Sequence, residues 1–300
     1  MGYNDLIFNG LLQAEESTTD MVMQYYSVST DEEVCSVLDQ WFAETTSDPS
    51  LLVMASSEYR IIMQAYRDRL ATMPANKQVL QFEGSIADNL NLVTFQVSMY
   101  GASYLAGVAA REMLADTTVS GITLKKNAMV MLGTSIDPTI LPAADGFSDG
   151  YRKVGWDGSV DTHCLSADYS GYANALLGYQ KMYEWSQRYS FFYPVAGGSN
   201  NGVFRYLREY PDKGYTCGMD VDQSGLCNAI IGSMVKHVDR LLNYYITTWM
   251  HTGALPPSAT YDLSSGYVDF LPIAGFPFAS AVEAARPAAI AAEQEYLTTR

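Results

Sequence analysis

Residues 195–204 read VAGGSNNGVF, a glycine-rich stretch between a hydrophobic run and an apolar, helix-like segment. The preceding FFYPVA (191–196) is aromatic, β-branched or small and predicts a buried strand. The following VFRYLREY (203–210) places arginines between apolar side chains, which is typical of a helix. The glycines and small polar residues between them therefore form a strand-to-helix turn. Such a turn lets a ligand approach the backbone closely, although a turn without a ligand has the same composition.

The same alternation of strands and helices runs along the whole chain. Strands separated by helices of this length indicate βαβ units and a mostly parallel sheet. Further predicted strands are SLLVMASS (50–57), KQVLQFEG (77–84), LNLVTFQVS (90–98), NAMVMLGT (127–134), SVDTHCLS (159–166) and GYTCGMDVD (214–222). Predicted helices are LIFNGLLQAEES (6–17), EEVCSVLDQWFAE (32–44), EYRIIMQAYRDRLATM (58–73), GASYLAGVAAREMLA (101–115), SGYANALLGYQKMYEWSQ (170–187) and VEAARPAAIAAEQEYLTT (282–299), the last kinked or restarted at Pro287.

Length and charge limit the classes of function. A chain of 300 residues is long enough for about two domains. It contains no run of 18 apolar residues, so no membrane-spanning helix is predicted. The net charge of −15 argues against a nucleic-acid polymer or an anionic membrane surface as partner. A small ligand remains compatible with this charge.

The cysteines and histidines do not predict a metal site. None of Cys35, Cys164, Cys217 and Cys227 forms a CxxC pair, and the three histidines are scattered. Neighbouring side chains on a strand point in opposite directions, so His163 and Cys164 are not expected to form a catalytic pair. The cysteines are interpreted as core thiols, with one disulfide as an alternative if the chain is exported.

Several predicted strands end in small or polar residues. Ser56 and Glu83 follow two of the early strands, and Asp220 follows a late one. In open α/β sheets, ligands bind outside the carboxyl ends of the strands. Ordinary loop polarity explains any one of these residues, but their recurrence favours a common binding site.

Three stretches together resemble a known family. SYLAGVAA (103–110), VAGGSNNGVF (195–204) and GMDVDQSG (218–225) occur in this order, and SMVKHVD (233–239) follows. They are similar to the basic membrane protein, or PnrA-like, family of substrate-binding lipoproteins of ABC transporters, which import nucleosides and especially purine nucleosides.

The resemblance implies a type I periplasmic-binding fold of the α/β class. Two doubly wound lobes are then joined by three crossings, with the ligand in the cleft between them. The implied lobes are 1–96 with 224–265, and 97–223 with 266–300. The resemblance further implies that the first strand of the family is missing or reduced in this chain, because the sequence begins inside the loop that follows this strand in the family. The resemblance also implies an extracytoplasmic, lipid-anchored monomer that docks on a membrane permease, and neither a cofactor nor catalysis.

The family's ligand contacts transfer residue by residue. In the first lobe, Asn4 and Asp5 match polar residues of the first loop, and Phe8 is the candidate aromatic that stacks on the base. Phe8 is equally typical of an amphipathic helix core. Glu83 stands where the family tends to have an Asp that accepts from the base edge, and Ser56 ends a neighbouring strand. The added methylene of Glu leaves the purine preference open.

In the second lobe, Gly197 and Gly198 offer backbone N–H groups to the ligand. Asp220 matches a carboxylate that accepts from the ribose hydroxyls, and Lys236 matches a lysine that donates to the ribose. The alternative for Lys236 is a solvated helix lysine, but the apolar run IIGSMVKHV around it favours the ligand role. Tyr193 or Val195 occupies the second stacking position, and with Val195 half of the aromatic sandwich is lost.

Two other classes of function remain open. A receptor of the same fold for a sugar is compatible with Glu83 and with the 22 tyrosines. A nucleoside-processing enzyme would need a carboxylate cluster holding a metal, and only Asp220 and Asp222 lie close together near the predicted cleft.

Overall fold

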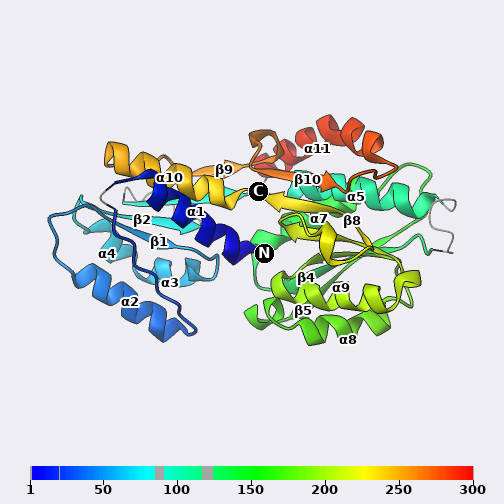
Figure 1. Cartoon of the computed structure of the whole chain (residues 1–300), viewed down its shortest axis with the longest axis horizontal. Coiled ribbons are helices and arrows are strands. Elements are labelled where there is room, and N and C mark those ends of the chain that lie inside the picture. The colour runs from blue at the N-terminus through cyan, green and yellow to red at the C-terminus, as the bar shows by residue number, and fades with distance from the viewer. Residues whose placement is uncertain (1, 20, 85–90, 117–123, 300) are drawn as a thin grey trace. The chain divides into compact units, whose positions relative to one another are not determined.

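The computed structural model describes residues 2–19, 21–84, 91–116 and 124–299, and the chain divides into two compact units (Figure 1). Unit 1 comprises Met1–Tyr3, Val97–His237 and Tyr261–Arg300. Unit 2 comprises Asn4–Gln96 and Val238–Thr260. Beyond the first residues, the chain passes between the units three times, after Gln96, His237 and Thr260.

The second and third passages differ from the implied lobe boundaries of 224 and 265. Residues 224–237 belong to unit 1 because they include a strand that pairs on both sides within the sheet of that unit. Residues 261–265 also belong to unit 1. The sequence does not predict this strand, because a short apolar run such as IIGSMVK is compatible with a buried strand or a helix segment.

Unit 1 is built on a six-stranded sheet in the order β10-β8-β7-β6-β4-β5. The five strands β5, β4, β6, β7 and β8 pair in parallel, and β10 is antiparallel to β8. The predicted parallel sheet is therefore confirmed in this unit. The strands are β4 (Ala128–Thr134), β5 (Val160–Ser166), β6 (Phe191–Val195), β7 (Tyr215–Asp220), β8 (Ile230–Lys236) and β10 (Val268–Pro272).

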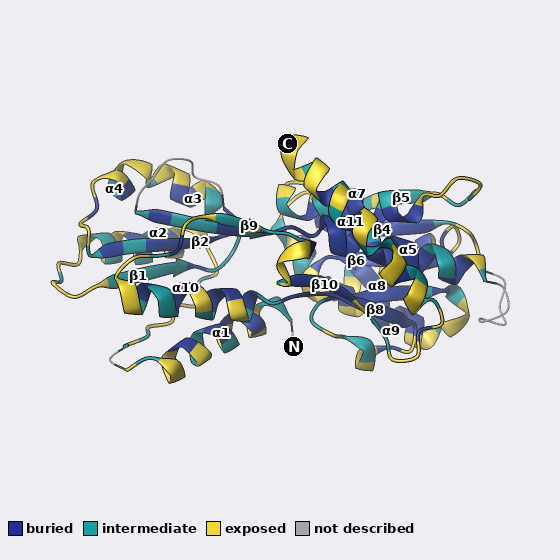
Figure 2. Cartoon of the chain, turned by 90° about the horizontal axis from the view of Figure 1, so that it is seen from above, coloured by how far each residue is buried: buried dark blue, intermediate teal, exposed yellow. Residues whose placement is uncertain are grey.

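Helices cover both faces of this sheet, which makes the unit doubly wound (Figure 1). On one face, Tyr193 of β6 stacks on Phe147 of α7 with ring centroids 4.7 Å apart. On the other face, Phe192 belongs to a core cluster with Trp185 of α8 and Phe204 of α9. Burial on both faces explains why β4, β6 and β8 read as nearly continuous apolar runs (Figure 2). The helices are α5 (Tyr100–Ala115), α7 (Leu141–Tyr151), α8 (Ala175–Trp185), α9 (Asn200–Glu209) and α11 (Ala279–Thr299), which continues through Pro287.

Glycines let α5 and α7 pack backbone to backbone. A Cβ added at Gly150 would lie 1.9 Å from the carbonyl oxygen of Tyr104, and one at Gly146 would lie 2.1 Å from that of Tyr100. Neither contact is possible for a larger residue without displacement of a helix. The helical layer above the sheet of unit 1 is therefore tightly fixed.

Unit 2 has a smaller sheet in the order β1-β2-β3-β9, with β1, β2 and β3 parallel. Val79 of β2 packs in a cluster with side chains of α2, α3 and α4, whereas Phe95 of β3 contacts Tyr245 of α10 on the opposite face. The strands are β1 (Ser50–Met54), β2 (Lys77–Phe82), β3 (Leu92–Val97) and β9 (Ala259–Tyr261); the helices are α1 (Tyr3–Ser17), α2 (Asp31–Ala43), α3 (Tyr59–Ala65), α4 (Arg67–Ala71) and α10 (Val238–Thr252). Leu90, at the start of a predicted strand, lies outside the described residues.

The described part of unit 2 contains no strand before Ser50. Residues 21–28, MVMQYYSV, have a composition typical of a strand but form no regular structure. Val22 and Tyr25 on this segment are 89% and 70% exposed. β1 lies at the edge of the sheet, and its apolar side chains are only half-buried apart from the buried Met54.

Lys77, at the start of β2, holds the end of α2. Its ammonium group is buried and donates to the backbone oxygen of Trp41 and, at 2.6 Å, to that of Glu44. Burial lowers the pKa of Lys77 below its ordinary value. The lysine therefore satisfies carbonyl groups that the end of a helix leaves without partners.

The cysteines are all free thiols, so the disulfide alternative is not realised. Cys217 and Cys227 are buried, as predicted for core thiols, whereas Cys164 is exposed because β5 is an edge strand. Among the described residues, no helix combines the length and the apolar character needed to cross a membrane.

Candidate ligand-binding site

The candidate site in unit 1 lies where its parallel strands end. Because β4 to β8 run in the same direction, their carboxyl ends meet at one edge of the sheet. The predicted Gly197, Asp220 and Lys236 all occur at such ends. The sheet therefore brings together residues that lie up to 39 positions apart in the sequence, from Gly197 to Lys236.

Asp220 is the last residue of β7 and adopts a left-handed backbone conformation, with φ at +67°. This conformation is uncommon for residues other than glycine and occurs preferentially at functional sites. Its side chain is 14% exposed. Burial raises the pKa of the Asp220 carboxyl, and the positive charge of Lys236 opposes this shift.

Lys236 is the last residue of the neighbouring strand β8, and its Nζ lies 4.0 Å from Oδ1 of Asp220. The interpretation of Lys236 as a solvated helix lysine is wrong, because the residue belongs to a strand and its side chain is only 8% exposed. The ammonium group also lies 5.4 Å from the ring centroid of Tyr3, at cation–π distance. One buried anion and one buried cation thus stand side by side at the strand ends.

The remaining residues of GMDVDQSG shape the loop that follows. The side-chain oxygen of Gln223 accepts a hydrogen bond from the N–H of Met219, and the N–H of Gln223 donates to Oγ of Ser233. Asp222 is exposed and accepts from the N–H of Ser224. The motif therefore combines one carboxylate for a ligand with side chains that hold the loop against β8.

The glycine loop after β6 is also fixed by its own polar residues. Oγ of Ser199 donates to the carbonyl of Gly171 and accepts from the N–H of Asn174, both at 2.7 Å. Oδ1 of Asn200 accepts from the N–H of Ala196 at 3.0 Å. Gly197 has φ at +53°, which explains the need for glycine at this position. Ser199 and Asn200 therefore serve the turn, which leaves Gly197 and Gly198 as its candidate ligand contacts.

Tyr172 forms a wall of this site that the sequence does not predict. A Cβ added at Gly133, at the end of β4, would lie 2.6 Å from the Tyr172 ring, and one at Gly198 would lie 3.2 Å from its carbonyl oxygen. Its hydroxyl donates to Oδ2 of Asp137 at 2.9 Å. Burial, Asp137 and Asp220 all raise the pKa of Tyr172, so it remains neutral. No local motif marks this residue, because its partners lie at the ends of β4 and β6, at least 26 positions away in the sequence.

The structure distinguishes between the two candidates for the second stacking position. Tyr193 is fully buried, stacks on Phe147 and shares a hydrogen bond with Oγ of Ser103 at 2.7 Å. Its ring is thus part of the core between β6 and the helices, which removes it as a candidate for stacking. Val195, 4% exposed at the end of β6, is the remaining candidate.

Unit 2 carries a second carboxylate at a strand end. Glu83 follows β2, is 7% exposed and has φ at +50°. Among the described residues, Glu83 and Asp220 are the only ones other than glycine with positive φ. Beside it, Nε2 of the buried Gln81 donates to the carbonyl of Ser56 at 2.9 Å and so links the ends of β1 and β2.

The other predicted residues of unit 2 lie on α1. Asn4 and Asp5 are exposed in its first turn, so the prediction that they belong to a loop is wrong. Phe8 is 46% exposed, and its ring makes an edge contact with Tyr25 at 6.3 Å. The alternative of a core role for Phe8 is therefore excluded.

The family model for "ABC transporter substrate-binding protein PnrA-like" matches residues 2–284. The chain belongs to the PnrA-like family of ABC-transporter substrate-binding proteins. Such proteins bind a small molecule for an ABC transporter rather than convert it, and those of importers act outside the cytoplasmic membrane. No individually curated protein matches the sequence.

Solved structures show the same type I periplasmic-binding fold in this PnrA-like protein. A solute-binding protein of an ABC transporter from Aeropyrum pernix K1 superposes with a TM-score of 0.70 at 18% identity, covering 90% of this chain and 72% of that one. A transcriptional activator of the comK gene from Bacillus halodurans has a TM-score of 0.67 at 18% identity, with 96% and 94% covered. A periplasmic solute-binding protein from Actinobacillus succinogenes 130z with bound D-allose has a TM-score of 0.61 at 12% identity, with 90% and 92% covered.

Proposed function

We propose that this protein is the nucleoside receptor of an ABC importer, with a purine nucleoside as its ligand. The observation that carries the proposal is the pairing of Asp220 with Lys236 at the ends of β7 and β8. A carboxylate can accept from both vicinal hydroxyls of a ribose, and an ammonium group can donate to ribose oxygens. The strained backbone of Asp220 supports a functional role for this pair.

The other predicted residues contact the remaining parts of the nucleoside. The N–H groups of Gly197 and Gly198 donate to the sugar edge, while Glu83 accepts from the N–H groups of a base. Phe8 stacks on the base from one side and Val195 packs against the other. Asn4, Asp5 and Ser56 supply further polar contacts. Residues of both units then bind one ligand, and their closure around it is favoured by contacts that form only in the closed state.

The proposal extends to partners and location. The closed form docks on the permease of the transporter as a monomer outside the cytoplasmic membrane, and a lipid anchor holds it there, as is typical of the family. Its acidic surface, with a net charge of −15, disfavours binding to nucleic acid.

A sugar is the alternative ligand, and two observations favour it. Val195 offers no aromatic face for a base. Several solved relatives of this fold hold sugars, such as D-allose and D-arabinose. In this case Asp220 and Lys236 still bind vicinal hydroxyls, but Glu83 would bind a hydroxyl instead of a base.

Isothermal titration calorimetry tests both ligands. The protein is unfolded and refolded to remove any bound ligand, and then titrated with inosine, guanosine, adenosine, cytidine, D-allose and D-arabinose. We expect micromolar or tighter binding of a purine nucleoside. Asp220→Ala should weaken it about 100-fold, because hydrogen bonds to a buried charge are lost.

Asp222→Ala is the matched control, since Asp222 is an exposed carboxylate two residues away. It should leave the affinity unchanged. If only a sugar binds, the ligand is a sugar instead of a nucleoside, and the proposed role of Asp220 is kept. Equal affinity of Asp220→Ala and the unchanged protein for the nucleoside would overturn the assignment.

A further inference from the structure

The segment Tyr261–Tyr267 connects all three places where the chain passes between the units. The N–H of Ser98, just after the first passage, donates to the carbonyl of Tyr261 at 2.8 Å. The N–H of His237, the last residue before the second passage, donates to the carbonyl of Tyr267 at 2.8 Å. Tyr261 itself is the first residue after the third passage. The unit 1 ends of the three passages are thus held together in one place.

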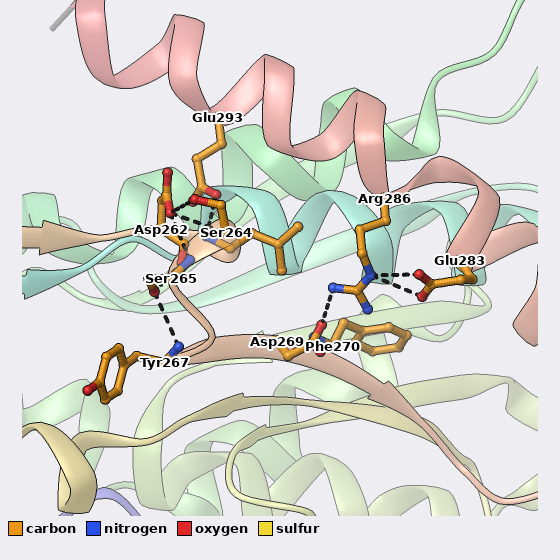
Figure 3. Close-up of polar contacts among 10 residues, drawn as sticks. Asp262, Ser264, Ser265, Tyr267, Asp269, Phe270, Glu283, Arg286 and Glu293 are labelled. Carbon is orange, nitrogen blue, oxygen red and sulfur yellow. Dashed lines mark hydrogen bonds and ion pairs between the residues drawn. The ribbon is translucent and has the colours of Figure 1, made fainter.

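Glu293 of α11 reaches into this place with a fully buried carboxylate. Its Oε1 accepts from Oγ of Ser98 at 2.5 Å and from the N–H of Gly101 at 3.0 Å. Its Oε2 accepts from the N–H of Leu263 at 2.8 Å. Figure 3 shows Glu293 descending from α11 towards the turn that contains Asp262 and Ser264. One side chain therefore joins the segments that follow the first and the third passage.

The surrounding sequence is adapted to this carboxylate. A Cβ at position 101 would lie 2.4 Å from Oε2 of Glu293, so Gly101 makes room for it. Asp262 caps the next turn by accepting from the N–H of Ser264 at 3.0 Å, and so keeps the N–H of Leu263 in place. Earlier on α11, Arg286 pairs with Asp269 of β10 at 2.9 Å. This ion pair also holds the helix on the sheet of unit 1.

Burial of a carboxylate carries a desolvation penalty that an apolar side chain does not have, which points to a role beyond packing. Burial raises the pKa of Glu293, while the donors from Ser98, Gly101 and Leu263 lower it. Replacing a buried charge by apolar groups often does not destabilise a protein. The benefit of this carboxylate is its geometry, because two oxygens accept from two separate segments at once.

We propose that Glu293 is a positioning residue of the hinge, which fixes the segments 98–101 and 261–263 to unit 1. At the first and third passages, bending between the units is then confined to the residues before Ser98 and before Tyr261, which narrows the range of positions that unit 2 can adopt. The proposal rests on the closing motion of the proposed function, but it does not depend on which ligand drives that motion.

The chain supplies its own pair of positions for a distance measurement. Cys35 lies on α2 of unit 2 and Cys164 on β5 of unit 1, and both are at least partly exposed. Cys217 and Cys227 are buried and should not react. Spin labels on Cys35 and Cys164 therefore report the distance between the units by pulsed electron resonance, in the full chain and without any ligand.

We expect Glu293→Gln to broaden the distribution of this distance, because its amide group cannot accept from both segments. Glu295→Gln is the matched control, since Glu295 is an exposed carboxylate two positions along the same helix. It should leave the distribution unchanged. An unchanged distribution in Glu293→Gln would overturn the proposal, even if the thermal stability falls, because a purely structural contact would affect stability alone.

If Glu293→Gln does not fold, a second variant with a smaller change tests the same proposal. Ser98→Ala removes one donor and leaves the carboxylate with Gly101 and Leu263. It should give a smaller broadening, and no broadening in this variant would then overturn the proposal. Since the measurement uses no ligand, failure to bind any nucleoside would affect the proposed function and leave this result valid.

Discussion

Both units consist of a mostly parallel sheet with helices on its two faces, but they differ in size and in how closely the helices pack. Unit 1 has six strands with helices on both faces, and helices α5 and α7 approach to backbone contact. Unit 2 has four strands, and its edge strand β1 exposes part of an apolar run that is typical of an interior strand. Each unit nevertheless places one buried carboxylate with positive φ at the end of a strand, Asp220 in unit 1 and Glu83 in unit 2.

The same difference applies to the predicted ligand residues of each unit. Asp220 has a charged neighbour on the adjacent strand, and its loop is tied to β8 by Gln223 and Ser233. Glu83 depends on a link between β1 and β2 that Gln81 makes through Ser56. We therefore expect unit 1 to supply the rigid part of the site and unit 2 to supply the part that adapts.

The largest contrast should appear in helix packing. Gly150→Ala would place a methyl group 1.9 Å from the Tyr104 oxygen, whereas Gly10→Ala in unit 2 would place one 2.7 Å from the Asp239 oxygen. Overpacking of this kind costs about 1–3 kcal/mol, and we expect the upper end for Gly150→Ala and the lower end for Gly10→Ala. Equilibrium unfolding in urea measures both. A larger loss from Gly10→Ala would mean that unit 2 is the more rigid one.

The pH dependence of stability should differ in sign between the units. The raised pKa of Asp220 means that the folded state holds a proton that the unfolded state has lost. Stability therefore falls as the pH rises above about 4, the ordinary value, up to the raised value. The lowered pKa of Lys77 has the opposite result, because the unfolded state keeps its proton longer. Stability then rises with pH in the alkaline range, up to the ordinary pKa of about 10.4.

Urea unfolding over a range of pH checks both slopes. Each group contributes at most about 1.4 kcal/mol per pH unit. Asp220→Asn should flatten the acidic slope alone, and Lys77→Met the alkaline slope alone. If Asp220→Asn leaves the acidic slope as it is, the buried carboxylate does not carry the shift.

Much of the fold could be predicted from the sequence, because its strands and helices have distinct local patterns. The six strands outside β6 that the alternation predicts are all present, although the helix predicted for 58–73 is divided at Tyr66 into α3 and α4. The strand β8 could not be predicted, since a short apolar run has no decisive period. Because β8 belongs to unit 1, the second passage between the units lies at 237–238 instead of at the implied boundary of 224.

The candidate site was predictable only where a motif marks it. Asp220 and the glycine loop lie in short motifs, and Lys236 in a stretch of the same resemblance. Tyr172 meets Asp137, 35 residues away, and Glu293 meets Ser98, 195 residues away. Such contacts come from the order of strands in the sheet and the return of the last helix. No local pattern contains that information.

The most direct test of the account is whether Asp220 recognises the ribose. Inosine and 2′-deoxyinosine are titrated by calorimetry into the unchanged protein, Asp220→Ala and Glu83→Ala. We expect the unchanged protein and Glu83→Ala to prefer inosine by about tenfold or more, the value of one hydrogen bond to a charged group. Asp220→Ala should bind both nucleosides equally. If Asp220→Ala keeps the preference for inosine, the carboxylate does not bind the ribose, and the central claim fails.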